Sequence, residues 1–424
     1  MAKTIEIHAL VCYTLIYTNL KLVGNPAESK NRMKKQIAIL GFGVVGGGCA
    51  DVLYDNKQTI SKKTGFDIEV KYILDLRDFP DSPYADKVVH DINIILDDPE
   101  VELVAEMMGG SHPALEFSLA AMNRGKHVVT SNKEVVSVHG IELLAAAEKN
   151  NVKYMFEASV GGGIPVIHTI DTSLAQNNIS EIDGILNGTT NYILTRMNTA
   201  GVSFDEALAE AKSLGYAEAN PSADVDGIDA CRKICILAAL AFGKLPNPES
   251  TYAEGIRNIT SADVDNAAKL GGTIKLIGRA FADGDRLGAY VSPMVVKNSN
   301  PLSTVSDVFN GIKIDGDKVG EVMLYGRGAG KLPTASAVVA DIINILTGNG
   351  VSYDFTAAED KDVVPFAEVK SARMIATDKK ADGLKEISDC LYVTEEISES
   401  EYAELENKLS ETGIKVLSAI RILK

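Results

Sequence analysis

The chain has 424 residues, enough for two or three domains, and its 46 % hydrophobic and 24 % charged residues are ordinary for a soluble globular protein. The formal net charge of −16 argues against sequence-independent nucleic-acid binding, because that binding needs a basic surface to displace counterions. The five cysteines are scattered and odd in number, so they indicate no disulfide framework, and we expect a cytoplasmic protein.

The first segment of the chain, residues 1–32, is expected to be an extension outside the folded domains. Residues 7–22 are apolar but carry polar interruptions such as His8 and Asn19, so this stretch is too short and too polar for a membrane span. Only Lys3 precedes the apolar run, and no small-residue cleavage site is evident, which argues against a secretory signal. We therefore expect no membrane partner.

A glycine-rich turn follows the first predicted strand. Residues 37–40 are apolar and predict a short buried parallel strand, and a helix is predicted at residues 46–54. Between them, Gly41 permits a tight turn, Gly43 lets a pyrophosphate approach the backbone, and Gly46 lets the helix pack closely. The helix N-terminus would face the phosphates. The pattern predicts a dinucleotide site formed by Gly41, Phe42, Gly43, Val44, Val45 and Gly46, with a purely structural turn as the alternative.

The second predicted strand, residues 67–76, ends where a dinucleotide fold places the acid that binds a ribose hydroxyl. Asp75 occupies this position, which favours NAD. Arg77 follows two residues later and could neutralise the 2′-phosphate of NADP. The two residues give opposite indications, so the choice between NAD and NADP stays open, and a solvated strand end is the simpler alternative for Asp75.

Polar residues follow the next predicted strands. Gly109 comes after the strand at residues 101–107, and Ser131 and Lys133 come directly after the strand at residues 126–130. Open α/β sheets bind their ligands at the carboxyl ends of their strands. Lys133 is therefore expected where cofactor and substrate meet, with an exposed loop lysine as the alternative.

Three consecutive glycines follow the predicted strand at residues 152–156. They belong to residues 157–165, a stretch that begins with Glu157 and leaves several backbone carbonyls bare. One carboxylate and several carbonyl oxygens suit a hard cation, but a hinge between domains fits the same residues. The sequence does not separate these two interpretations.

The region after the three glycines contains a strand predicted at residues 179–185 and a mostly apolar helix predicted at residues 226–242. Thr190 lies in the polar loop after the strand, which suits either a small polar substrate or a helix cap. Asp229 and Lys233 share one face in the first turns of the helix. A stripe that begins charged and ends apolar is typical of a helix whose first turns line a cleft, and the pair suits proton transfer. A surface ion pair is the alternative.

Another glycine-rich turn, residues 325–330, precedes a helix predicted at residues 335–346. Beyond residue 350, strands predicted at residues 389–395 and 415–423 flank a helix predicted at residues 399–411. Such a unit could be a small regulatory appendage.

Together, these segments resemble the homoserine dehydrogenase family from about residue 33 to about residue 346. The resemblance rests on motifs in the expected order: GFGVVG (41–46), TSNK (130–133), EASVGGGIP (157–165), GILNGTTNYIL (184–194), GYAEANPSADVDGIDACRK (215–233) and GRGAGKLPTASAVVAD (326–341). It implies an enzyme that interconverts L-aspartate 4-semialdehyde and L-homoserine with NAD(P)H, a step toward threonine, methionine and isoleucine.

The resemblance also implies roles for single residues. Lys133 and Lys233 match the acid–base lysines, and Asp229 matches the acid beside the second lysine. Glu218 matches the acid that holds the substrate amino group, and Gly330 matches a backbone contact near the nicotinamide. A monovalent cation, Na⁺ or K⁺, is implied at Glu157, Val160, Gly162 and Ile164.

We therefore expect an α/β protein with three parts. A Rossmann-type dinucleotide-binding domain covers residues 33–165 with part of residues 320–346, and an α+β substrate and dimerisation domain covers residues 166–325. A small, partial ACT-like tail covers residues 350–424. The family resemblance implies a homodimer, with a tetramer as the alternative.

Two departures from the family pattern bear on function. Leu74 precedes Asp75 where many members carry an arginine, and the tail matches only the later half of an ACT domain, so threonine inhibition stays open. Two other functions need weighing: an acylating aspartate-semialdehyde dehydrogenase, which needs a nucleophilic cysteine, and a non-catalytic dinucleotide sensor. Cys49 and Cys231 lack suitable surroundings, and both lysines are present, so the dehydrogenase is preferred.

Overall fold

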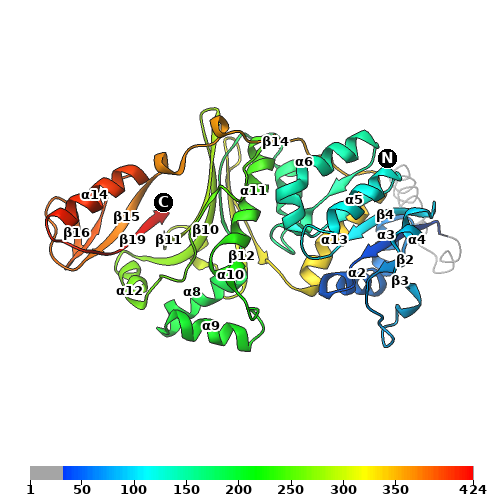
Figure 1. The fold of residues 1–424 in the computed structure, drawn as a ribbon, viewed down its shortest axis with the longest axis horizontal. Helices are drawn as coiled ribbons and strands as arrows, with labels where there is room; N and C mark the ends of the chain where they lie inside the picture. The colour runs from blue at the N-terminus through cyan, green and yellow to red at the C-terminus, as the bar shows by residue number, and fades with distance from the viewer. Residues whose placement is uncertain (1–31, 424) are drawn as a thin grey trace, which may run out of the picture.

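The computed structural model describes residues 32–423. The expected extension at residues 1–32 therefore lies outside the described residues, apart from Arg32. Figure 1 shows three parts in a row: a domain with a parallel sheet, a central domain with long strands, and a C-terminal unit. No helix within residues 32–423 is long and apolar enough to cross a membrane.

The N-terminal domain contains a six-stranded sheet with the order β3-β2-β1-β4-β5-β6, and all its neighbouring strands run parallel. The strand order reverses at β1, which has β2 on one side and β4 on the other, and such a reversal is where open α/β sheets bind ligands. The strands are β1 (Lys34–Leu40), β2 (Asp67–Leu74), β3 (Val88–Val89), β4 (Val101–Glu106), β5 (His127–Thr130) and β6 (Tyr154–Met155).

One helix from late in the chain completes this domain. Helix α13 (Lys331–Leu346) packs against α2 (Val44–Asp55), and Figure 1 shows the two side by side. The predicted helix began at residue 335, but the structure begins it four residues earlier, directly after Gly330. The other helices of the domain are α3 (Lys57–Thr64), α4 (Ile92–Leu96), α5 (Ala114–Asn123) and α6 (Lys133–Lys149).

The prediction of a buried first strand, made from the apolar run at residues 37–40, is confirmed. Ile37, Ala38, Ile39 and Leu40 are all fully buried, as expected for a strand covered on both faces. The structure extends this strand back to Lys34, whose exposed side chain pairs with Glu69 of β2.

The central domain is built on a mixed sheet of eleven strands, whose main path has the order β13-β12-β7-β10-β11-β19-β15-β17-β16. Helix α8 packs against β10 and β12, and helix α11 packs against β10 and β7. The strands from this domain are β7 (Ile179–Ile185), β9 (Tyr252–Ala253), β10 (Gly272–Asp283), β11 (Arg286–Lys297), β12 (Phe309–Gly316) and β13 (Gly320–Arg327). The helices are α7 (Val166–His168), α8 (Gly188–Ala200), α9 (Phe204–Ser213), α10 (Ser222–Val225), α11 (Ile228–Phe242) and α12 (Ser261–Lys269).

The C-terminal unit continues the central sheet. Strand β19 runs parallel to β11 and antiparallel to β15, so the two units share one sheet. The sequence predicted β19 (Val416–Leu423) and α14 (Glu399–Glu411) but missed β15 (Lys370–Thr377) and β16 (Lys385–Ser388). The remaining strands are β17 (Leu391–Val393) and β18 (Ile397–Ser398), with the small pair β8 (Lys244–Leu245) and β14 (Thr356–Ala357) elsewhere.

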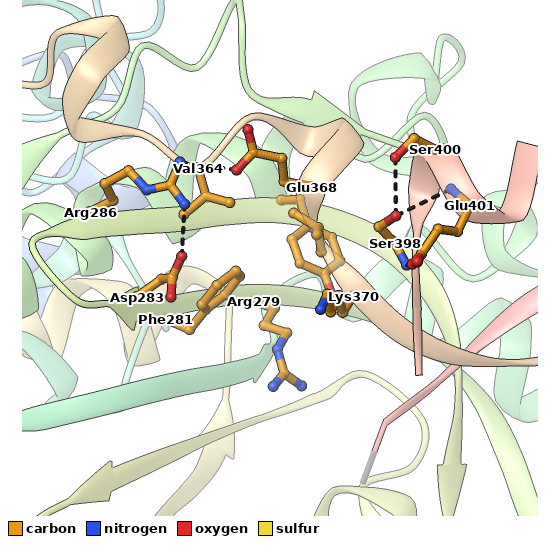
Figure 2. A pocket seen from close by; sticks show the side chains of 12 residues that line it. Arg279, Phe281, Asp283, Arg286, Val364, Glu368, Lys370, Ser398, Ser400 and Glu401 are labelled. Atoms are coloured by element: carbon orange, nitrogen blue, oxygen red, sulfur yellow. Dashed lines mark hydrogen bonds and ion pairs between the residues drawn. The ribbon is translucent and has the colours of Figure 1, made fainter. Parts of the chain in front are cut away.

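A cavity of about 650 Å³ lies between β10 and β11 on one side and residues 364–370 and 398–401 on the other. Figure 2 shows Arg279 and Arg286 on the sheet side and Ser398, Ser400 and Glu401 on the side of α14. Arg286 pairs with Asp283 at 3.0 Å. None of the predicted site residues lines this cavity.

Candidate active site

A second cavity, of about 630 Å³, lies where the N-terminal and central domains meet. Its similar volume means that size does not identify the site; the convergence of charged groups does. Its lining combines Val44, Val45, Ser131 and Lys133 with Glu218, Asp229 and Lys233, and it includes Gly162 and Gly330.

Two lysines from different domains meet on one carboxylate in this cavity. Lys133 is the first residue of α6, and its Nζ lies 3.1 Å from Oδ1 of Asp229. Lys233 lies one turn after Asp229 on α11, and its Nζ lies 2.7 Å from Oδ2. The Lys233 ammonium also donates to the backbone carbonyl of Leu186 at 2.8 Å. The predicted cleft helix is therefore confirmed as a structural feature.

The carboxylate of Asp229 is buried but ionised. Burial raises its pKa, but the charges of Lys233 and Lys133 outweigh burial and hold the pKa well below its usual value. The residue also lies in the first turn of α11, where the helix dipole favours a negative charge. One permanent anion therefore fixes two ammonium groups at the cavity wall.

Asn187, which the sequence analysis did not select, orders this cluster. Its Nδ2 donates to Oδ1 of Asp224 at 2.7 Å and to Oδ2 of Asp229 at 2.8 Å, while its Oδ1 accepts from the backbone N–H of Thr190. Asparagine before a predicted helix is a capping signal, which could have drawn attention to it. Burial raises the pKa of the neighbouring Asp224.

Thr190 does not line the cavity. It is 1 % exposed, and its hydroxyl donates to the carbonyl of Asn187 at 3.1 Å, so it serves the cap at the start of α8. The preceding residue, Thr189, lines the cavity instead, beside Tyr216 and Glu218 from the loop after α9. The structure therefore places Thr189, and not the predicted Thr190, on the cavity wall.

The glycine turn after β1 has the form that a dinucleotide requires. Gly41 has a φ of +88°, and a Cβ there would lie 2.9 Å from Met108. A Cβ on Gly46 would lie 2.0 Å from the carbonyl oxygen of Gly41, so only glycine allows the helix to approach. Gly43 has open space around it, which leaves room for a pyrophosphate. These residues fit the cofactor that the motif predicts.

A third cavity, of about 620 Å³, lies on the other side of this turn. Gly41, Gly43, Asp75, Arg77 and Gly109 line it, whereas the next residues after Gly43 line the cavity with the lysines. An extended ligand laid across the turn would therefore reach both cavities. Phe42 points away from both: its ring packs on Phe79 and Tyr84, and its backbone N–H donates to Asp75.

Asp75 and Arg77, which gave opposite indications in the sequence, form one ion pair. The Arg77 guanidinium donates to Asp75 through Nε and Nη2, each at 3.0 Å, and these bonds lower the pKa of Asp75 to about 2. Oδ2 of Asp75 also accepts from the backbone N–H of Phe42 at 2.8 Å. His90 lines the same cavity, and its Nδ1 lies 2.7 Å from the carbonyl oxygen of Asp75.

The glycine-rich stretch after β6 forms part of the junction between the domains. Glu157 is 3 % exposed, and its carboxylate oxygens accept from the backbone N–H groups of Ile167 and His168 at 2.9 and 2.6 Å. Gly162 packs against the backbone of Gly328, and Val160 and Ile164 are buried. Within residues 32–423, no group of three or more His, Cys, Asp or Glu side chains could hold a metal ion.

A Rossmann-type sheet with a glycine cradle, joined to a cavity with two lysines on one carboxylate, defines an oxidoreductase that uses a nicotinamide dinucleotide. Comparison with known proteins agrees: the model for the NAD-binding domain of homoserine dehydrogenase matches residues 41–157, and the homoserine dehydrogenase model matches residues 165–343. The chain belongs to the homoserine dehydrogenase family.

Individual relatives give the extent of the similarity. The homoserine dehydrogenase of a Synechocystis strain is 43 % identical over 74 % of each chain. The crystal structure of the Thiobacillus denitrificans enzyme has a TM-score of 0.86 at 32 % identity, covering 93 % of this chain and all of the other. A hyperthermophilic archaeal homoserine dehydrogenase in complex with NADPH has a TM-score of 0.64 at 30 % identity, covering 74 % and 98 %.

Proposed function

We propose that Lys133, Lys233 and Asp229 form the site at which this oxidoreductase reversibly reduces L-aspartate 4-semialdehyde to L-homoserine, a step in amino-acid biosynthesis. The observation that carries the proposal is the convergence of Lys133 and Lys233 on Asp229 within one cavity. Two ammonium groups beside each other are suited to stabilise the negative charge that develops on a carbonyl oxygen during reduction.

Each charged residue of the cavity has its own role in the proposed reaction. Asp229 and Leu186 hold the Lys233 ammonium, so that it can donate a proton to the developing alkoxide. Lys133 reaches the same place from the dinucleotide domain and links the two binding regions. Glu218 lines the cavity and supplies an anion for the amino group of the substrate. When bound, the reduced nicotinamide supplies hydride to the aldehyde carbon.

We propose that NAD is preferred over NADP. The Asp75 carboxylate is ionised at neutral pH and is fixed at the end of β2, where it can accept a hydrogen bond from a ribose hydroxyl. A 2′-phosphate at the same place would face this charge, and the guanidinium that could neutralise it is already held by Asp75. NADP use would require Arg77 to leave its partner.

A monovalent cation near Glu157, Val160, Gly162 and Ile164 is also proposed. Glu157 and Asp341 are 3 % and 1 % exposed and adjacent, since the backbone N–H of Glu157 donates to Asp341 at 2.8 Å. Burial raises the pKa of both carboxyl groups, and among the described residues no lysine or arginine pairs with either. A cation held mainly by carbonyl oxygens would favour their ionised forms. Rates measured in K⁺, Na⁺ and choline salts of equal ionic strength test this, and equal rates in all three would contradict it.

The protein is expected to act in the cytoplasm as a homodimer built on the central domain, or as a tetramer. The alternative of an acylating dehydrogenase finds no support in the cavity, because none of the four cysteines within residues 32–423 lines it.

Initial rates with homoserine and each coenzyme separate the three candidate functions. We expect reduction of NAD, and more slowly of NADP, with no requirement for phosphate. An acylating aspartate-semialdehyde dehydrogenase would reduce the coenzyme only with its aldehyde substrate and phosphate. A sensor would bind the coenzyme but never reduce it, and that result would overturn the proposed function.

A further inference from the structure

Glu106 is a buried carboxylate to which the proposed reaction gives no role. It is the last residue of β4 and is 0 % exposed, at the carboxyl end of the sheet where the dinucleotide cradle lies. A buried carboxylate is costly unless hydrogen bonds compensate for its lost hydration.

The hydrogen bonds to Glu106 come from two segments at the carboxyl end of the sheet, the loop after β4 and the last residue of β5. Oε1 accepts from the backbone N–H of Met108 at 2.6 Å, and Met108 and Gly109 line the cavity on the Asp75 side. Oε2 accepts from the hydroxyl of Thr130 at 2.5 Å, at the end of the neighbouring strand β5. One carboxylate therefore ties together the loops that follow two adjacent strands.

The second of these loops carries Lys133. The hydroxyl of Thr130 accepts from the backbone N–H of Asn132 at 2.9 Å, and Asn132 Oδ1 accepts from the first backbone N–H groups of α6. Asn132 Nδ2 closes the circuit by donating to the carbonyl of Gly110 at 2.7 Å. Hydrogen bonds therefore connect Glu106 to the first turn of α6, which begins with Lys133.

We propose that Glu106 is a positioning residue: it fixes the loop after β4 against the start of α6, and so sets where the Lys133 ammonium meets Asp229. The inference rests on the proposed role of Lys133 in the reaction. It adds a residue that touches neither substrate nor coenzyme and that acts through Thr130 and Asn132.

The ionisation of Glu106 gives this role a measurable signature. Burial raises its pKa to about 7, against the hydrogen bonds from Thr130, Met108 and Asn132, which lower it. The titratable group that Glu106 influences is the buried phenol of Tyr154 on β6, whose own pKa is raised far enough to keep it neutral. The groups that contact the carboxylate are hydrogen-bond donors, so its protonation below pH 7 removes an acceptor and loosens the two loops.

The test is the pH profile of homoserine oxidation by Glu106→Gln. The amide is nearly isosteric, but it cannot accept both hydrogen bonds and does not ionise. We expect kcat to fall 10- to 100-fold, because a small misplacement of a reacting group has this effect, while the KM for homoserine changes less than threefold. We also expect the ionisation near pH 7 in the wild-type profile to disappear. Wild-type kcat with an unchanged profile would overturn the inference.

Two further variants keep the result interpretable. Thr130→Val retains the carboxylate of Glu106 but breaks its link to Asn132, so it should also lower kcat. This variant tests the inference even if Glu106→Gln fails to fold. Ser118→Ala removes a buried hydroxyl of α5 that has no hydrogen-bond partner and should leave kcat and the profile unchanged. Lys133→Ala distinguishes a failure of the proposed role of Lys133 from a failure of the positioning role of Glu106. Full activity in Lys133→Ala would overturn the proposed role of Lys133. An inactive Lys133→Ala together with a fully active Glu106→Gln would overturn only the role of Glu106.

Discussion

At the scale of single residues, the site depends on one carboxylate that pairs with a lysine of its own helix and with a lysine of the other domain. Asp229 holds Lys233 from its own helix and Lys133 from the other domain. The sequence predicted the first pair from its spacing of four residues, because i and i+4 share a helix face. It could not predict the second pair or the contacts of Asn187, because both depend on how the two domains meet.

Asp75 allows a residue-scale prediction about the coenzyme. Asp75→Ser removes the fixed negative charge and releases Arg77 to meet a 2′-phosphate. We expect the ratio of kcat/KM for NADP over NAD to rise at least tenfold, or about 1.4 kcal/mol, since like charges in contact cost this much or more. Steady-state kinetics with both coenzymes measures it. Asp78→Ser, an exposed carboxylate beside His90, is the matched control, and an unchanged ratio in Asp75→Ser would contradict the preference.

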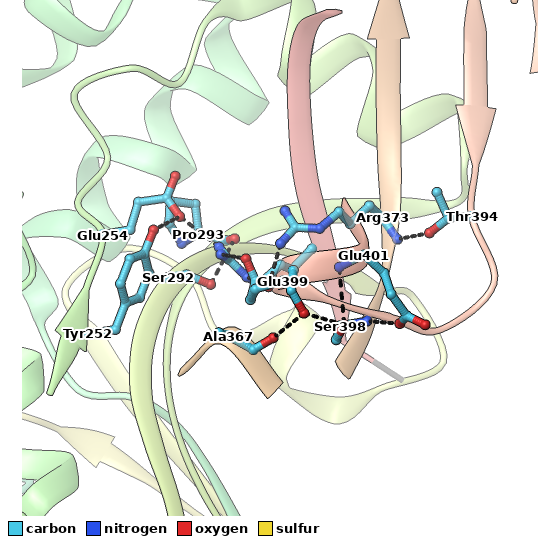
Figure 3. A network of polar contacts seen from close by, with 12 residues as sticks. Tyr252, Glu254, Ser292, Pro293, Ala367, Arg373, Thr394, Ser398, Glu399 and Glu401 are labelled. Carbon is cyan, nitrogen blue, oxygen red and sulfur yellow. Dashed lines mark hydrogen bonds and ion pairs between the residues drawn. The ribbon is translucent and has the colours of Figure 1, made fainter. Parts of the chain in front are cut away.

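At the scale of elements, the C-terminal unit is attached more firmly than its sequence indicated. Strand β19 joins the central sheet, and Arg421 on it is 4 % exposed. Figure 3 shows the polar network of this junction, including Glu254 and Glu399. The Arg421 guanidinium donates to Glu399 at 3.0 and 2.8 Å and to Glu254 at 2.7 Å. The strands β15 and β16 escaped prediction because their short runs mix charged and apolar residues, and only pairing with β19 and β17 fixes them as strands.

Replacing this buried arginine should weaken the attachment. Arg421→Met leaves the partly buried Glu399 with one cation fewer, and we expect a loss of about 3 kcal/mol in the free energy of unfolding. Denaturant unfolding followed by circular dichroism measures it. The matched control is Arg286→Met, whose pairs with Asp283 and Glu368 are exposed and should contribute less than about 1 kcal/mol. Equal losses in the two variants would show that Arg421 has no special role.

At the scale of the whole molecule, local pattern predicted the parallel sheet well. Buried strands, glycine turns and carboxyl-end loops follow one another along the chain, so the order of residues carries the order of elements. The central sheet joins strands far apart in the sequence, such as β7 and β12, and its topology could not be predicted from local pattern. The ACT-like description of the tail remains a prediction.

The edge of the central sheet supports a prediction about assembly. Strand β13 is the outer strand of the sheet, and its residues include Met323, Leu324 and the 57 % exposed Tyr325. An exposed apolar edge strand is a liability that proteins cover. We expect light scattering to give the mass of a dimer or a tetramer, and Tyr325→Lys to shift the mass toward the monomer. A monomer at micromolar concentration in the wild type would contradict this.

The central claim is that two ammonium groups from separate domains act on one carbonyl. The most direct test is homoserine oxidation by Lys233→Ala, with coenzyme binding measured in parallel and Lys34→Ala, a surface lysine paired with Glu69, as control. We predict that kcat falls by a factor of about 10² to 10⁴ while the coenzyme Kd and the control stay near wild type. An unchanged kcat in Lys233→Ala would contradict the account.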